Sequence, residues 1–159
     1  MKKILALAAA LLLTFTAFAQ DGKSIYNKYS DAESISAVYI SPAMFRMLGK
    51  VPDIDINGQR NLTSVIKSLS GMYIISSENS RINEDMKKDV MKFVKSGRFE
   101  LLMEAKDDGE TVHIYTSGKG DIINSFVLLA TERDETTFIC LEGQLSRQQL
   151  EAIMADNLN

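Results

Sequence analysis

The chain is poor in the residues that build covalent or metal-centred structure. Its 159 residues include one cysteine, one histidine, two prolines and no tryptophan. A single thiol cannot close an intramolecular disulfide, and a single imidazole excludes a histidine-rich metal site. The scarcity of proline and the absence of any low-complexity stretch argue against a linker between domains. We therefore expect one domain, held together by packing and without a cofactor.

The amino-terminal residues have the pattern of a secretory signal peptide. Two lysines precede an unbroken apolar run, Ile4–Leu13, and small residues surround Phe18 in Ala17–Ala19. This order of charge, short apolar stretch and small residues predicts cleavage after residue 19. A membrane anchor is the alternative, but Ile4–Ala19 is shorter than the roughly 20 residues that span a bilayer. We expect removal of residues 1–19 and delivery of the mature chain, without a stable membrane span, to the periplasm or cell envelope.

The mature chain, residues 20–159, has the length of one ordinary domain. The full sequence has a formal net charge of −3, and loss of the two lysines of the signal peptide makes that −5. Binding of nucleic acid requires a basic surface, and the densest basic segment, Lys87–Arg98, also contains acidic and apolar residues. We therefore expect neither nucleic acid nor an anionic membrane surface as a partner.

Hydrophobic periodicity predicts alternating helices and strands in the first part of the chain. The predicted elements are a helix within Ile25–Tyr29, a strand Ser34–Ile40, a helix Pro42–Leu48, a helix Leu62–Leu69 ended by Gly71, a strand Met72–Ser76 and a helix Ile82–Val94. A loop is expected over 51–60. The last helix is the clearest, because its apolar residues recur at helical spacing and a glycine, Gly97, follows it.

The period changes to two after this helix, which predicts a hairpin. Phe99–Lys106 and Glu110–Ser117 flank Asp108 and Gly109, a pair of residues that strongly favours a tight turn. The resulting register pairs Asp107 with Glu110, Ala105 with Val112, Glu104 with His113, Met103 with Ile114, and Leu102 with Tyr115.

A second hairpin is predicted from Ile122–Thr131 and Thr136–Leu141. Both of its faces are apolar. One face carries Val127, Leu129, Phe138 and Cys140, and the other carries Phe126, Leu128, Ile139 and Leu141. Strands that are apolar on both faces are normally covered twice, so helices, another copy of the chain or a protein partner must cover the second face.

These elements together predict an α+β fold. We expect a mainly antiparallel sheet of about six strands, four of them a late meander, with four or five helices packed on it. Ser146 and Gln149 have the spacing of a capping box and predict the start of a final helix. The pattern does not determine the order of the strands.

A calcium loop is one candidate site. Asp53, Asp55, Asn57 and Gly58 have the spacing that opens an EF-hand loop, in which alternate oxygens bind the ion. The twelfth position, which should supply a bidentate carboxylate, is Ser64. We therefore interpret the segment as a polar turn and keep a calcium site at Asp53, Asp55 and Asn57 as the alternative.

His113 and Cys140 are the two residues whose chemistry most often serves catalysis. The predicted pairing of His113 with Glu104 is typical of a solvated cross-strand pair, whereas a catalytic dyad would need a nucleophile, for which Tyr115 is the nearest candidate. Cys140 lies within an apolar strand without neighbouring cations. It is therefore expected to be a buried, unreactive thiol.

Two further motifs have structural explanations. Met44 and Met47 could offer thioether ligands to copper(I), but their position beside Phe45 favours core packing of a short helix. Ser117–Asp121 contains two glycines in the manner of a phosphate loop. Because it joins two predicted strands and precedes no helix, we interpret it as a hairpin connection.

Four segments together resemble one protein family. They are Val38–Phe45, Leu69–Ile75, Ser125–Leu129 and Leu141–Leu145. They are similar to a family of small exported proteins of Gram-negative bacteria that is classed as a domain of unknown function. Some of its members are lipoproteins, from which this chain differs because it has no cysteine after the expected cleavage site. The resemblance implies an envelope or periplasmic setting and carries no catalytic residue to this chain.

Two classes of function follow from these observations. The first is a non-catalytic exported protein that binds a protein partner through its apolar sheet face, with self-association as one form. The alternatives are a small hydrolase that uses carboxylates, for which no spacing singles out two acids, and a calcium-binding exported protein.

The calcium alternative can be tested by calorimetry. Because the loop lacks its bidentate carboxylate, titration of the protein with millimolar calcium is expected to release no binding heat. Heat that disappears when Asp53 and Asp55 are both changed to Asn would establish the site.

Overall fold

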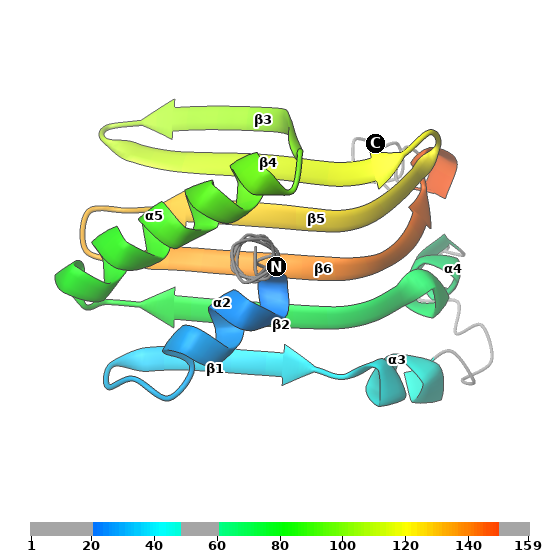
Figure 1. Cartoon of the computed structure of the whole chain (residues 1–159), viewed down its shortest axis with the longest axis horizontal. Coiled ribbons are helices and arrows are strands. Elements are labelled where there is room, and N and C mark those ends of the chain that lie inside the picture. Colours follow the sequence, from blue (N-terminus) through cyan, green and yellow to red (C-terminus); the bar gives the residue numbers. More distant parts are fainter. Residues whose placement is uncertain (1–20, 49–60, 150–159) are drawn as a thin grey trace, which may run out of the picture.

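One antiparallel sheet organises the chain in a computed structural model, which describes residues 21–48 and 61–149. The sheet has six strands in the order β1-β2-β6-β5-β4-β3 (Figure 1). The strands are β1 (Ile35–Ile40), β2 (Leu69–Ser77), β3 (Glu100–Asp107), β4 (Glu110–Lys119), β5 (Ile122–Thr131) and β6 (Thr136–Ser146). The predicted α+β class, the six strands and the late meander from β3 to β6 are confirmed.

The described helices occupy two places around the sheet. They are α2 (Gly22–Tyr29), α3 (Pro42–Leu48), α4 (Asn61–Ser68) and α5 (Ser80–Ser96). Helices α2 and α5 cross the same face, whereas α3 and α4 lie at one end of the strands (Figure 1). No helix in the described ranges is both long enough and apolar enough to cross a membrane.

The face beneath α2 and α5 contains the hydrophobic core. Helix α5 presents one apolar stripe at helical spacing, which consists of Met86, Val90, Phe93 and Val94. The sheet contributes the alternate residues of its central strands, which are Tyr73, Ile75, Val127, Leu129, Phe138 and Cys140. All of these side chains are buried. The prediction that Val127, Leu129, Phe138 and Cys140 share one buried face is therefore confirmed.

Helix α2 is fixed to this face by contacts at both of its ends. At its start, the Asp21 carboxylate accepts the Ser24 backbone N–H at 2.7 Å, and Gly22 approaches the strand so closely that a Cβ atom would lie 2.5 Å from the Cys140 Sγ. At its end, Lys28 and Tyr29 both bond the Asp89 carboxylate of α5, with the tyrosine hydroxyl at 2.6 Å. The two helices therefore form one layer.

The register of the first hairpin is confirmed with one exception. Asp107, Ala105, Glu104 and Met103 face the predicted partners, but a bulge shifts the ladder so that Leu101, and not Leu102, faces Tyr115. A bulge places one extra residue in a strand and reverses the alternation beyond it. The predicted alternation fails only past this point.

The boundary between α4 and β2 differs from the prediction. The helix ends at Ser68, and β2 starts at Leu69, so that Gly71 lies inside a strand and does not end a helix. Leu69 pairs with Gly143 of β6 at the start of this ladder. A tertiary pairing therefore starts the strand at Leu69, before its predicted start at Met72, and ends the helix one residue earlier than predicted.

The end of β6 agrees with the predicted capping box. The Ser146 backbone N–H donates to the Gln149 side chain at 2.9 Å, and the Gln149 backbone N–H donates to the Ser146 hydroxyl at 3.1 Å. Residues 147–149 are helical. The remainder of the predicted final helix lies outside the described residues.

Removal of the Asp89 charge is expected to loosen α2. Burial would raise the pKa of Asp89, but hydrogen bonds from Lys28 and Tyr29 outweigh burial and hold the pKa below its ordinary value. Asp89→Asn should therefore lower the free energy of unfolding at pH 7 by about 1–2 kcal/mol. A carboxyl group with a lowered pKa stabilises the folded protein fully only above its unfolded-state pKa. The difference in stability between the parent and Asp89→Asn should therefore shrink as the pH falls below 4.

Urea denaturation between pH 3 and pH 7 measures this difference. The exposed Asp85, on the same helix, is the control: Asp85→Asn should change stability by less than about 0.5 kcal/mol. Equal effects of the two substitutions would show that Asp89 does not connect the helices.

Candidate functional site

The face of the sheet opposite α2 and α5, called the open face below, carries a row of apolar side chains across all six strands. Direct cross-strand pairing aligns Val38, Ile74, Ile139, Leu128, Ile114 and Met103. At the two edges, Val38 is 44% exposed and Met103 is 45% exposed. The residues between them are half-buried by their neighbours in the sheet.

Two flanking rows extend this surface along the strands. On one side lie Ile40, Met72, Leu141, Phe126 and Thr116, with Glu100 at the edge, and on the other lie the smaller Ser36, Ser76, Thr137, Ala130, Val112 and Ala105. Thr116 is buried and adds no exposed surface. Apart from Glu100, these rows contain no charged residue. The predicted second apolar face of the β5–β6 hairpin therefore belongs to a larger apolar surface.

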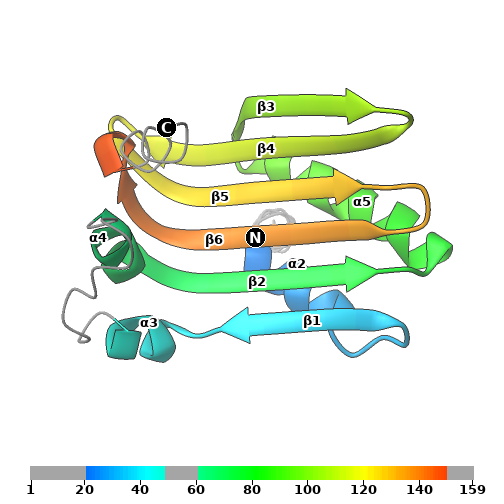
Figure 2. The ribbon, with the colours of Figure 1, turned by 180° about the vertical axis from the view of Figure 1, so that it is seen from behind.

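Described helices leave the open face uncovered. Figure 2 shows this side of the molecule, with α2 and α5 behind the sheet and α3 and α4 beside the ends of the strands. Phe45 of α3 is buried, so this helix packs with its aromatic side chain inward at that end. The middle of the open face has no cover from the described part of the chain.

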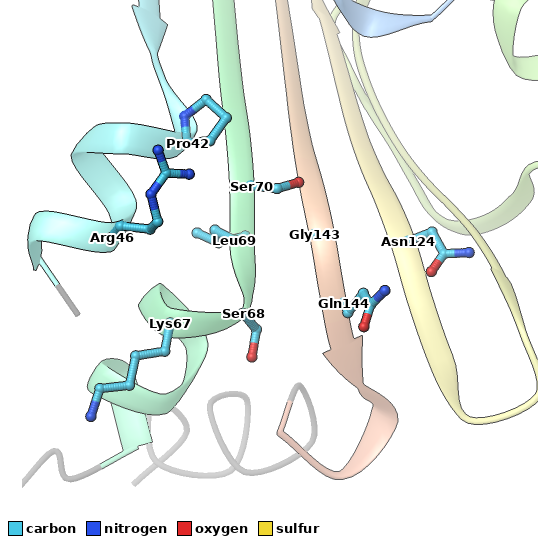
Figure 3. Close-up of a pocket in the computed structure, with 9 residues that line it drawn as sticks. All are labelled: Pro42, Arg46, Lys67, Ser68, Leu69, Ser70, Asn124, Gly143 and Gln144. Atoms are coloured by element: carbon cyan, nitrogen blue, oxygen red, sulfur yellow. The ribbon is translucent and has the colours of Figure 1, made fainter.

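A cavity of about 800 Å³ lies where α3 and α4 meet the sheet (Figure 3). Its lining consists of Pro42, Arg46, Lys67, Ser68, Leu69, Ser70, Asn124, Gly143 and Gln144. Both charged residues are cationic, and neither forms an ion pair within residues 21–48 and 61–149. Lys67 extends away from the strands (Figure 3). The lining of this cavity is therefore electropositive.

A smaller cavity of about 330 Å³ lies on the helix-covered side and brings two carboxyl groups together. Asp21 and Glu142 both line it, together with Phe93 and Phe99. Burial raises the pKa of Glu142, the nearby Asp21 charge raises it further, and a hydrogen bond from the Gly22 backbone N–H opposes both effects. The two acids are more than a hundred residues apart in the sequence, so no local signal indicated that they meet.

Both acids of this cavity have structural partners. Asp21 accepts hydrogen bonds from the backbone and hydroxyl of Ser24, and Glu142 accepts the backbone N–H of Gly22. Each therefore satisfies donors in the first turn of α2, as helix-capping carboxylates do. The pair explains how α2 begins and does not require a reaction.

The predicted pair of His113 and Glu104 is confirmed. The histidine Nε2 lies 2.8 Å from one carboxylate oxygen, and Lys106 lies 2.7 Å from the other. Hydrogen bonds from Lys106 and His113 lower the pKa of Glu104. The hydroxyl of Tyr115, the candidate nucleophile, donates to the Met91 sulfur at 3.6 Å. No nucleophile is directed at this histidine among the described residues, which favours a structural pair.

The predicted burial of Cys140 is confirmed, whereas that of the two methionines is wrong. Cys140 is fully buried, and burial raises the pKa of its thiol to about 12, so the reactive thiolate is absent at neutral pH. Met44 is 46% exposed and Met47 is 66% exposed. Helix α3 contacts the sheet only through the side that carries Phe45, which leaves the methionines in solvent.

The remaining candidates do not form a site in the described residues. The hairpin connection predicted at Ser117–Asp121 is confirmed but shorter: Ser117–Lys119 ends β4, and Gly120, at a φ of 62°, and Asp121 make the turn to β5. Asp53, Asp55 and Asn57 lie outside the described residues, so a calcium site there stays a prediction. Within residues 21–48 and 61–149, no three histidine, cysteine or acidic side chains gather as metal ligands would.

Comparison with protein families gives a match over residues 29–153, to a domain of unknown function, DUF4252. The match covers most of the chain. The chain belongs to the DUF4252 family. No curated protein shows significant similarity to it. The predicted resemblance to a family of unknown function is confirmed.

The DUF4252 match contains the whole open face but only part of the cavity between Asp21 and Glu142. It includes every strand and therefore the whole open face. It begins at Tyr29, after Asp21 and nearly all of α2. The open face is thus a feature of the DUF4252 region itself, whereas one member of the Asp21 and Glu142 pair lies outside that region.

Removal of the charge at Glu142 is expected to stabilise this DUF4252 domain. A raised carboxyl pKa means that ionisation costs more in the folded protein than in the unfolded chain, so stability declines as the pH rises through the folded-state pKa. Glu142→Gln keeps an oxygen for the Gly22 N–H and should raise the urea midpoint at pH 7. The gain should vanish below pH 4, where the native carboxyl is protonated.

Glu100→Gln is the matched control, because Glu100 is exposed on β3 and its nearest cation, Arg147, is 3.9 Å away. It should leave the midpoint unchanged at both pH values. A Glu142→Gln protein that is less stable than the parent at pH 7 would show that the carboxylate holds a favourable charge interaction.

Proposed function

We propose that this chain is an exported, non-catalytic domain that binds a protein partner through its open face. The observation that carries the proposal is the apolar row that crosses all six strands without a described helix above it. The predicted signal peptide supports a role outside the cytoplasm. Export would expose this surface to other proteins of the periplasm or envelope.

The size of the surface favours an interface. Six strands about 4.8 Å apart, and three rows of side chains about 7 Å apart, give a flat footprint of about 600 Å². The largest apolar patch of a typical monomer covers about 300–600 Å², and patches of this size commonly mark interaction sites. The open face lies at the upper end of that range, although its third row includes hydroxyl groups.

The shape and chemistry of the face favour a protein over a small ligand. Small molecules bind in concave sites with a few polar groups that fix their orientation. The open face is a broad sheet surface, and its central row offers no hydrogen-bonding side chain. A second broad apolar surface fits it better, as in the packing of one sheet on another.

The carboxyl pair that the structure offers to the hydrolase alternative is Asp21 with Glu142. The contacts of this pair support the hydrolase less well than the open face supports protein binding. A carboxylate pair with separated pKa values is the pattern of acid–base catalysis. Here both groups bond the first turn of α2. The pH dependence predicted for Glu142→Gln tests their structural role directly.

Site-specific photocrosslinking in cells tests the binding proposal. A photoreactive phenylalanine analogue at Ile139 or Leu128, in the centre of the open face, is expected to give a discrete adduct in the envelope fraction. Its placement at Lys87, an exposed position on α5, should give none. Ile74→Asp, beside Ile139 in the same row, should abolish the adduct because a buried unpaired carboxylate prevents docking.

Adducts of equal yield at Ile139 and Lys87, or none at either position, would overturn the proposal. Circular dichroism and urea denaturation of the Ile74→Asp protein verify that loss of the adduct reflects loss of docking. Since Ile74 lies on the face away from the core, its replacement should leave the fold intact.

A further inference from the structure

We infer that the occupant of the open face is a second copy of this chain, packed face to face with its strands reversed. The inference rests on the proposed function, because it names the partner of the same surface. Three observations support it: one end of the sheet is strongly acidic whereas the other carries cations, the central apolar row runs the full width of the sheet, and the footprint approaches that of a stable dimer.

One end of the sheet, called the turn end below, is strongly acidic. Here the chain enters β1, leaves β2 and makes the β3–β4 and β5–β6 turns (Figure 1). The carboxylates at this end are Asp31, Glu33, Glu78, Asp107, Asp108, Glu110, Glu132, Asp134 and Glu135. The cations among these connections and their flanking residues are Lys106, Arg133 and Arg81, the last in the first turn of α5. The mutual repulsion of the carboxylates disfavours any arrangement that brings two turn ends together.

The opposite end of the sheet, called the helix end below, has no such excess of carboxylates among the described residues. It comprises α3, α4, the β4–β5 turn and the end of β6 (Figure 2). Among the described residues its cations are Arg46, Lys67, Arg98, Lys119 and Arg147, against the carboxylates Asp21, Glu100, Asp121 and Glu142. Arg46 and Lys67 line the large cavity at this end. The molecule is therefore polar along the direction of its strands.

This polarity selects one of the two ways in which the open faces can stack with two-fold symmetry. A two-fold axis along the strands would place acidic turn ends against each other. An axis across the strands reverses one copy, so that each turn end meets the helix end of its partner. In that arrangement β1 lies near β1 of the second copy, which brings Arg46 and Lys67 toward the partner's Glu33 and Glu78.

The apolar rows are compatible with this symmetry. The two-fold axis across the strands runs parallel to the central apolar row. Rotation about it therefore places this row against the same row of the second copy, as an isologous interface requires. A flat footprint of about 600 Å² underestimates the accessible surface of a layer of side chains. The buried area therefore approaches the roughly 800 Å² per partner of standard interfaces.

Sedimentation velocity on the chain, purified as the cells process it, measures the oligomeric state. The native chain is expected to sediment as a dimer at micromolar concentration. Ile139→Asp should weaken the dimer at least tenfold, because it places a charge at the centre of the interface. Lys87→Asp, on the helix-covered side, should leave the dimer intact.

Charge exchange tests the reversed orientation. Arg46→Glu with Lys67→Glu, or Glu33→Lys with Glu78→Lys, should each weaken the dimer severalfold, and more so at low salt. All four substitutions in one chain should restore it, since opposite charges then meet again across the interface. Within one copy, Arg46 and Lys67 lie at the opposite end of the sheet from Glu33 and Glu78. Recovery of the dimer would therefore report a contact between copies.

A native chain that is monomeric up to 100 micromolar would overturn this inference. A dimer that persists with Ile139→Asp, or that fails to recover with the four exchanged charges, would overturn it too. Photocrosslinking at Ile139 separates this result from the proposed function. An adduct of twice the chain mass supports the second copy, whereas a discrete adduct of another mass overturns the second copy and upholds protein binding.

Discussion

The pairing of β2 with β6 is the interaction on which the rest of the structure depends. It joins the early strands to the late meander, and without it the sheet would separate into a two-stranded and a four-stranded piece. It also completes the apolar row, because Ile74 on β2 meets Ile139 on β6. The approach is close at Gly143, where a Cβ atom would lie 2.3 Å from the Ser68 carbonyl oxygen. Glycine at this position therefore permits α4 to lead directly into the sheet.

A second constraint is that a sheet has two faces, whereas the described helices cover only one. Helix α5 runs from β2 to β3 across three intervening strands, and α2 lies beside it, joined through Asp89. Their layer buries Phe138 and Cys140 completely, while Ile139 between them faces the opposite side. Because successive side chains of β6 point to opposite faces, the same strand contributes to the buried core and to the open apolar surface. The proposed binding role follows from this asymmetry.

The sequence predicted the faces of the β5–β6 hairpin because period-two alternation reports which side chains share a side. It also predicted the Glu104 and His113 pair, since the Asp108-Gly109 turn sets the register nearby. It did not predict the bulge at Leu102 or the meeting of Asp21 with Glu142. Bulges change the count of residues in one strand without a clear local signal, and contacts between residues more than a hundred positions apart depend on strand order.

Local patterns by themselves therefore determined the α+β class, the late meander, the capping box at Ser146 and the burial of Cys140. Each of these depends on residues that are neighbours in the chain, where periodicity and capping act. Only the tertiary structure decided the strand order, the position of α2 and α5 on one face, and the gathering of acidic connections at one end of the sheet. These features arise from long-range pairing, which places turns that are distant in the sequence at the same end of the sheet.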